Sequence, residues 1–312
     1  MRELRIMKND AGQRLDKFLL KYMPRLPQAM LYKSLRKDCV RVNGKHVRDG
    51  AFMLSEGDEL RLYMKDEFFA AKSGFEAVPY SFGIVYEDEN ILLVNKAAGV
   101  VVHADDRNTK NTLIEQVQSY LFEKGEYRPE AEQSFAPALC NRLDRNTAGI
   151  IIAAKNAAAL RAVNEKLRTR EIHKYYVCTV DGIMEGSGIL EANLTRGNKR
   201  VSISRSAKDG SKPVRLHYRT LSHSGGKTRL EIELLTGRTH QIRAQLAAAG
   251  HPLTGDVKYG GSRTKGGYSL TSHRLEFDFT SDGGVIGYLN GRVFELEDRI
   301  SDEKEDFFKK LQ

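Results

Sequence analysis

The residues best suited to chemistry lie in a polar loop that precedes a strongly apolar segment. Asp144 stands between Arg142 and Arg145, and residues 149–153 follow as an apolar run that predicts a buried strand. An aspartate has a reference pKa of about 3.9, and neighbouring guanidinium groups favour its charged form. Asp144 is therefore available as a nucleophile or a base rather than as an acid. A surface ion pair is the alternative interpretation, because the tripeptide Arg-Leu-Asp also occurs at residues 14–16.

A second polar cluster begins where an apolar alternation ends. Residues 229–235 alternate as expected of a strand, and a helix is expected at residues 240–249 after a short turn. In that helix Ile242 faces the core, while Arg238 and Arg243 lie near the start. A basic helix start after a strand can also bind a phosphate group, because the first N–H groups of a helix lack partners. The cluster by itself therefore leaves a phosphate-binding role open.

Together these segments resemble the RluA-type family of RNA pseudouridine synthases over about residues 80–280. The loop pattern Arg-Leu-Asp-Arg-x-Thr-x-Gly spans residues 142–149, which makes Asp144 the counterpart of the family's catalytic aspartate. The family's Lys-x-Tyr strand corresponds to residues 174–176, and its Gly-Arg-Thr-His-Gln-Ile-Arg segment corresponds to residues 237–243.

The resemblance implies roles for the residues at these positions. It implies that Tyr176 lines the uracil pocket, that Ile242 packs on the base, and that Arg243 pairs with the catalytic carboxylate. The expected catalytic residues are thus Asp144, Tyr176 and Arg243. The expected substrate contacts are Arg142, Arg238 and Ile242.

The implied reaction is the isomerisation of uridine to pseudouridine. It cleaves the N1 glycosidic bond, turns the detached uracil, and joins C5 to the same ribose carbon, so neither a cofactor nor a metal ion is expected. A carboxylate at Asp144 can attack the ribose as a nucleophile or remove a ribose proton to form a glycal. The uridine must first be flipped out of its stack, at a cost of a few kcal/mol, and Arg142 is a candidate to fill the vacated space.

The chain departs from the family pattern at two positions of the catalytic loop. Asn141 stands where the family commonly has His, and Ala148 where it commonly has Ser. Neither replaces a group that the reaction needs, although both fit a subgroup with a different substrate preference. They also leave room for a non-catalytic RNA-binding or ribosome-assembly protein, which the intact set of Asp144, Tyr176 and Arg243 disfavours.

Positive charge is concentrated near the N-terminus. Residues 12–50 hold ten Lys or Arg against three Asp, out of a formal net charge of +9 for the chain. A clustered basic face indicates a polyanionic partner, and no amphipathic segment with Trp anchors favours a membrane instead. Two short helices and an Asn-Gly hairpin turn resemble an S4-like RNA-binding module at residues 12–64. The side chains expected to contact RNA are Arg14, Lys17, Lys33, Arg36, Lys37 and Lys45.

The 312 residues exceed what one core usually organises, so a small domain attached to a larger one is expected. Strands separated by both helices and hairpins indicate an α+β catalytic domain with a mixed, largely antiparallel sheet. The S4-like part is a small α/β domain. The segments expected after it are a linker at 65–79, the catalytic domain at 80–295 and an acidic C-terminal tail at 296–312.

The sequence lacks the signature motifs of other functional classes. No Gly-x-Ser-x-Gly or Gly-x-x-x-x-Gly-Lys-Ser/Thr motif indicates a hydrolase or a nucleotide-binding loop. The three cysteines are odd in number and far apart, which favours reduced thiols. The eight histidines are scattered and are expected to be structural or surface groups.

The expected partner is structured RNA. Family members with this N-terminal module usually modify large-subunit (23S) ribosomal RNA, so the resemblance favours that substrate, with transfer RNA as the alternative. No apolar run approaches the roughly 20 residues of a spanning helix, and no apolar segment follows Met1 as in a secretion signal. The protein is expected to be a cytoplasmic monomer without membrane contact.

Overall fold

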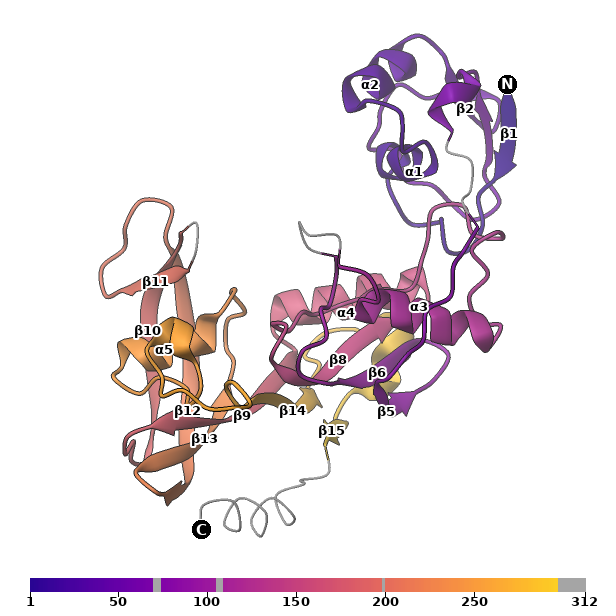
Figure 1. Ribbon diagram of the computed structural model, residues 1–312. Coiled ribbons are helices and arrows are strands. Elements are labelled where there is room, and N and C mark those ends of the chain that lie inside the picture. The colour runs from indigo at the N-terminus through magenta and orange to yellow at the C-terminus, as the bar shows by residue number, and fades with distance from the viewer. Residues whose placement is uncertain (70–73, 105–108, 198–199, 297–312) are drawn as a thin grey trace.

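The computed structural model describes residues 1–69, 74–104, 109–197 and 200–296. Its N-terminal domain, at the top right of Figure 1, packs two helices on a small sheet with strand order β1-β4-β2-β3. The helices and strands of this domain are β1 (Arg2–Arg5), α1 (Leu15–Tyr22), α2 (Gln28–Arg36), β2 (Val40–Val42), β3 (Lys45–His46) and β4 (Glu59–Leu62).

Apolar spacing explains how this domain closes. Leu15, Phe18 and Leu19 lie on one face of α1 and are fully buried. Asn43 and Gly44 both have positive φ angles, of 50° and 75°, as the two-residue turn between β2 and β3 requires. The strand β1, which pairs with β4, precedes the expected start of the domain at residue 12.

The expected linker is anchored at both ends. It begins with the 3-10 helix η1 (Asp66–Phe68), and Phe69 packs into the core of the N-terminal domain. Further along, Phe75 packs against Phe122 and Tyr127 of the catalytic domain. The expected acidic tail lies outside the described residues except for Leu296.

The catalytic domain is built on an 11-stranded sheet with the order β11-β10-β12-β13-β9-β14-β8-β6-β5, while β15 pairs with β14 and β7 with β8. Among the described residues β8 and β14 pair in parallel, and the other strand pairs of this sheet are antiparallel. The expected α+β class with a mixed, largely antiparallel sheet is confirmed. The strands are β5 (Gly83–Glu87), β6 (Ile91–Lys96), β7 (Ala138–Leu139), β8 (Ala148–Ala154), β9 (Ile172–Asp181), β10 (Ser187–Arg196), β11 (Val201–Ser204), β12 (Lys212–Ser224), β13 (Lys227–Glu233), β14 (Leu270–Phe277) and β15 (Val293–Glu295).

Helices cover both faces of the sheet at β6 and β8 (Figure 1). On one face α3 (Leu113–Glu123) packs over Leu92 and Ile151, and on the other α4 (Ala157–Thr169) packs over Leu93 and Ile152. Burial on both faces explains why these strands are continuous apolar runs rather than alternating ones.

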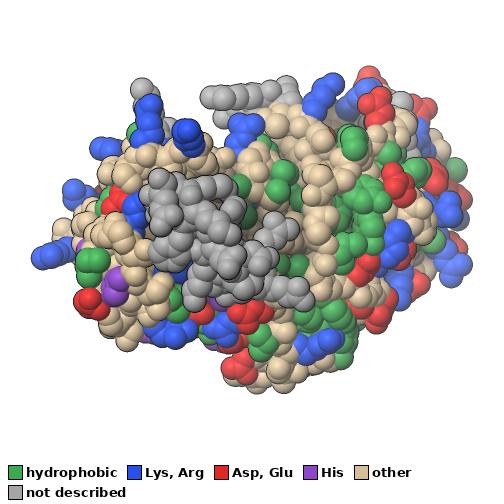
Figure 2. Space-filling model, turned by 60° about the horizontal axis from the view of Figure 1, so that its bottom comes forward, with side chains coloured by type: hydrophobic (Ala, Val, Ile, Leu, Met, Phe, Trp, Pro, Cys, Tyr) green, Lys and Arg blue, Asp and Glu red, His purple; other side chains and the backbone are tan. Residues whose placement is uncertain are grey.

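The other half of the sheet forms a lobe of β10, β11, β12 and β13 with α5 (Gln241–Ala248) against it (Figure 1). Figure 2 shows Lys and Arg side chains protruding along the edge of this lobe. No helix among the described residues is long and apolar enough to cross a membrane.

The junction between the two halves depends on one glycine. Gly149 has a φ of 112°, and a Cβ atom there would lie 2.2 Å from the backbone oxygen of Ser272. Only glycine therefore allows β8 to approach β14 closely enough for their parallel pairing. This contact fixes the point at which the loop carrying Asp144 enters the sheet.

Candidate active site

Asp144 lies in a tightly held loop between β7 and β8. The N–H of Thr147 donates to the carbonyl of Asp144 at 3.0 Å, which closes a turn. The side-chain oxygen of Asn141 accepts the N–H of Ile152 at 2.8 Å and ties the start of the loop to the strand. The loop can therefore hold a carboxylate in a fixed place at the edge of the sheet.

Arg243 holds that carboxylate from the opposite side. Its Nη1 donates to Oδ2 of Asp144 at 3.0 Å, although the two residues are 99 positions apart in the chain. Its Nε and Nη2 donate to Asp256 at 2.7 and 2.9 Å. Burial would lower the pKa of the Arg243 guanidinium, but the hydrogen bond to Asp256 and the nearby charges raise it, so Arg243 remains a cation.

His240 is the second group that faces Asp144. Its Nε2 lies 3.6 Å from Oδ2 of Asp144, the same oxygen that Arg243 contacts. Its Nδ1 lies 2.9 Å from the hydroxyl of Tyr259, which accepts the N–H of Val201 at 3.4 Å. The Tyr259 hydrogen is thus free to be donated to Nδ1, which leaves Nε2–H directed at Asp144.

His240 is half-buried and faces Asp144, so it is not a surface group. Burial lowers the pKa of its imidazole, so the ring is neutral at neutral pH. His240 precedes α5 with a φ of 55°, a conformation that few residues other than glycine adopt. The signal for His240 was its place inside the Gly-Arg-Thr-His-Gln-Ile-Arg segment at residues 237–243.

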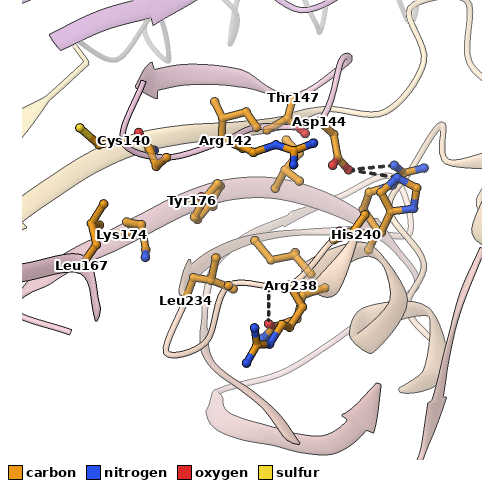
Figure 3. Close-up of a pocket in the computed structure, with 18 residues that line it drawn as sticks. Cys140, Arg142, Asp144, Thr147, Leu167, Lys174, Tyr176, Leu234, Arg238 and His240 are labelled. Carbon is orange, nitrogen blue, oxygen red and sulfur yellow. Dashed lines mark hydrogen bonds and ion pairs between the residues drawn. The ribbon is translucent and has the colours of Figure 1, made fainter. Parts of the chain in front are cut away.

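A cavity of about 420 Å³ opens beside Asp144. In Figure 3 Asp144 and His240 lie at one end, Lys174 and Leu167 at the other, and Tyr176 between them. All six residues expected to act on the substrate line this one cavity: Arg142, Asp144, Tyr176, Arg238, Ile242 and Arg243.

The walls of this cavity suit a flat, weakly polar ring. Tyr176, Ile242 and Leu270 contribute apolar surface, and all three belong to the core of the domain. Burial raises the pKa of Tyr176 to about 12, so its hydroxyl keeps its proton at neutral pH. Arg142 and Arg238 are exposed and lie on opposite sides of the cavity (Figure 3).

Comparisons with known proteins identify the family. The sequence pattern of the family described as RNA pseudouridylate synthase matches residues 90–248, which is more than half of the chain. The chain belongs to this family. It is therefore an isomerase that acts on RNA. The pattern of the S4 domain matches residues 13–60 of the same synthase.

Two bacterial relatives and one human structure illustrate the similarity. The synthase is 32% identical over 257 residues to ribosomal large subunit pseudouridine synthase D of Escherichia coli (strain K12), covering 82% of this chain and 75% of the relative. It is 30% identical over 326 residues to ribosomal large subunit pseudouridine synthase C of Escherichia coli O157:H7, covering 98% and 95%. The structure of human RNA pseudouridylate synthase domain containing 4 shares the fold, with a TM-score of 0.54 and 19% identity over 69% of this chain and 88% of that one.

Two residues of the synthase site had no predicted role. Asp256 anchors Arg243 and is 2% exposed. Lys96 is fully buried and donates to the carbonyls of Ala97, Val100 and Arg145 at 2.9, 2.9 and 3.0 Å. Burial lowers the pKa of Lys96 to about 8. The sequence offered one signal for Lys96, since residues 96–99 resemble the family's Lys-Pro-x-Gly segment with Ala97 in place of proline.

The six basic residues expected to contact RNA are exposed on the N-terminal domain. They are Arg14, Lys17, Lys33, Arg36, Lys37 and Lys45. Arg14 differs from the others because it forms a 2.7 Å ion pair with Asp16, so the alternative interpretation of that Arg-Leu-Asp tripeptide holds there.

Proposed function

We propose that this synthase isomerises uridine in large-subunit ribosomal RNA and that Asp144 is the carboxylate that reacts with the ribose. The observation that carries the proposal is the position of Asp144, paired with Arg243, at the mouth of a cavity that suits uracil. Ribosomal RNA is favoured because the two bacterial relatives bear names that refer to the large ribosomal subunit.

The two oxygens of Asp144 have different surroundings. Arg243 and His240 both approach Oδ2, and no described residue donates a hydrogen bond to Oδ1. Oδ1 is therefore the oxygen that attacks C1′ or removes a ribose proton, while Oδ2 stays paired with the Arg243 cation.

The uracil lies between Tyr176 and Ile242 while its glycosidic bond is broken and remade. The Tyr176 hydroxyl retains its proton, so it can exchange a proton with the base when C5 replaces N1 as the point of attachment. Arg142 and Arg238, on either side of the opening, hold the flipped nucleotide.

The N-terminal domain docks on structured RNA through its exposed cations. These charges make sequence-independent contacts with phosphates, which orient the RNA so that one uridine reaches the cavity. A ribosomal RNA substrate supports a cytoplasmic location.

The first test is the release of tritium from ribosomal RNA and transfer RNA labelled at uridine C5, because each conversion frees the C5 hydrogen. Wild-type protein should release tritium from ribosomal RNA, and Asp144→Asn should lower the rate by about 10³-fold or more. The variant should fold normally because Arg243 keeps its pairing with Asp256.

The exposed Asp209 supplies a matched control, and Asp209→Asn should release tritium at the wild-type rate. Near-normal turnover by Asp144→Asn would remove Asp144 from its role. Release from transfer RNA alone would overturn the proposed substrate, and no release from either pool would indicate a protein that binds RNA without modifying it.

A further inference from the structure

The cavity beside Asp144 is larger than one uracil ring requires. Cavities of several hundred Å³ hold ligands of drug size, and uracil is much smaller than such a ligand. With the ribose against Asp144 and the base between Tyr176 and Ile242, the ring directs its far edge toward the other end of the cavity. Figure 3 shows Cys140, Leu167 and Lys174 at that end, to which the proposed reaction assigns no role.

Lys174 reaches this end of the cavity from β9. It lies two residues before Tyr176 on the same face of the strand, roughly 7 Å away along the backbone. No described residue forms an ion pair with its ammonium group or accepts a hydrogen bond from it, and burial lowers the pKa of this group. An ammonium group that is partly withdrawn from water is stabilised by an acceptor, so a ligand that accepts hydrogen bonds would suit Lys174.

Asn141 brings a second unpaired donor to the wall of the same cavity. Its side chain accepts the N–H of Ile152 at 2.8 Å, and because a backbone N–H can only donate, the accepting atom must be the amide oxygen. The amide nitrogen, Nδ2, is buried and has no hydrogen-bond partner among the described residues. Buried polar groups without partners are rare in folded proteins. Lys174 and Asn141 therefore both offer unpaired donors to a ligand in this cavity.

The far edge of uracil supplies a matching acceptor. The carbonyl oxygen O4 lies opposite N1, the atom that is bonded to the ribose in uridine. When the ring turns and C5 takes the place of N1, the carbonyl oxygen O2 comes to lie opposite the new bond. A donor at the far end of the cavity therefore meets a carbonyl oxygen both before and after the turn. Cytosine carries an amino group in place of O4, so it would direct a donor against donors.

We infer that Lys174 and Asn141 recognise the carbonyl edge of the target base and thereby select uridine against cytidine. The inference rests on the proposed placement of the base and the ribose. It gives a role to the departure at Asn141, where the family commonly has His, since the amide nitrogen is a donor at any pH. A site of this kind discriminates strongly, because the wrong ligand leaves its donors buried and unpaired.

Binding of free nucleosides tests this role without turnover and without any phosphate group. Calorimetric titration of the full-length protein compares uridine with cytidine, which differ only at the far edge of the base. Wild-type protein should bind uridine at least about tenfold more tightly, as expected for one hydrogen bond that involves a charged group. Lys174→Met, which keeps most of the aliphatic stem and removes the ammonium group, should lose most of this preference.

Three further variants separate the donors from other effects of substitution. Lys174→Arg restores a cationic donor and should recover part of the preference. Asn141→Asp keeps an oxygen for the N–H of Ile152 and replaces the Nδ2 donor by an acceptor, so it should lower the preference as well. Lys65→Met removes a cation whose side chain is 79% exposed and should bind both nucleosides as the wild type does. Melting curves verify that each variant is folded.

Equal affinity of the wild type for the two nucleosides, or an undiminished preference in Lys174→Met, would overturn the inference even if tritium is released from RNA. Conversely, a preference that depends on Lys174 would support the inference even if no tritium is released, since binding needs no reaction. The failure of this recognition and the failure of the proposed reaction therefore give different results.

Discussion

Side chains at the site are oriented by partners that lie far away in the sequence. Asp144 depends on Arg243, and Arg243 depends in turn on Asp256. Aromatic rings complete the arrangement, since the guanidinium of Arg243 lies 4.4 Å from the ring centre of Tyr268 and 5.1 Å from that of Tyr259. Such a chain of contacts gives the carboxylate one orientation before any RNA arrives.

The variant His240→Asn tests how much the orientation of the Asp144 carboxylate depends on the neutral imidazole of His240. In His240→Asn the shorter side chain no longer reaches Asp144, while Asn tolerates the positive φ of this position. We expect kcat for tritium release to fall about tenfold, as for the loss of one polar contact, with little change in KM or in thermal stability. Single-turnover kinetics together with a melting curve measure both effects.

Tyr259→Phe is the matched control, because it keeps the ring and removes only the hydroxyl that contacts Nδ1 of His240. It should lower kcat less than His240→Asn does. Full turnover by His240→Asn would mean that Arg243 alone orients the carboxylate.

The sequence allowed prediction of the residues that belong to long motifs and of little beyond them. Asp144, Tyr176 and Arg243 were placed by their motifs, and the cavity brings them together. Asp256 and Lys96 were missed because their contacts, to Arg243 and to three backbone carbonyls, arise only after folding.

Elements were predictable where their apolar pattern was strong. The helix α5 and the strands β8 and β13 lie close to the expected positions. The strand β10 was missed because it lies near the edge of the sheet, where Leu194 is its one buried residue and its sequence has little apolar alternation. β14 was missed as well, and its parallel pairing with β8 depends on the single close approach at Gly149.

A buried ion pair joins three of these elements. Lys166 of α4 donates at 2.7 Å to Glu171, which precedes β9, and also donates to the hydroxyl of Ser281 at 2.8 Å, after β14. The Lys166 ammonium holds the pKa of the Glu171 carboxyl well below its ordinary value of 4.5. Its stabilising effect is therefore complete above pH 4.5 and is lost as the pH falls from there through the folded-state pKa.

We expect Glu171→Gln to lower the midpoint of urea unfolding at pH 7, since the variant leaves the buried Lys166 without its counter-charge. The gap between wild type and variant should narrow as the pH falls from 4.5 toward 3, because there the Glu171 carboxyl takes up a proton in the unfolded chain while it stays charged in the folded protein. Glu123→Gln, at an exposed position of α3, should show almost no gap at any pH. A gap for Glu171→Gln that stays constant with pH would contradict a role for the charge.

At the scale of the molecule, polar contacts fix the N-terminal domain on the catalytic domain. Ser134 donates through its hydroxyl and its N–H to Asp10, whose side chain is buried. Asn9 donates to Glu132 at 2.8 Å, and Arg161 of α4 donates to the carbonyl of Ala11 at 3.2 Å. Nothing in the sequence distinguishes these residues from ordinary polar surface residues. The orientation of the two domains could therefore not be predicted.

A fixed orientation means that the RNA-binding charges lie at a set distance from the cavity. Replacing Lys33, Arg36 and Lys37 together by Ala should weaken RNA binding without changing the fold, because all three side chains are exposed. If each contacts one phosphate, the slope of log affinity against log salt should fall in magnitude by about 2 to 3. Filter binding of ribosomal RNA at several salt concentrations measures this slope.

The charge-conserving variant Lys33→Arg, Arg36→Lys and Lys37→Arg separates charge from shape. It should keep the wild-type slope, since phosphate contacts by point charges depend little on the identity of the cation. Turnover at saturating RNA should stay near wild type in both variants, because neither changes the cavity around Asp144. An unchanged slope in the alanine variant would instead direct attention to the basic side chains on the lobe of β10 to β13 (Figure 2).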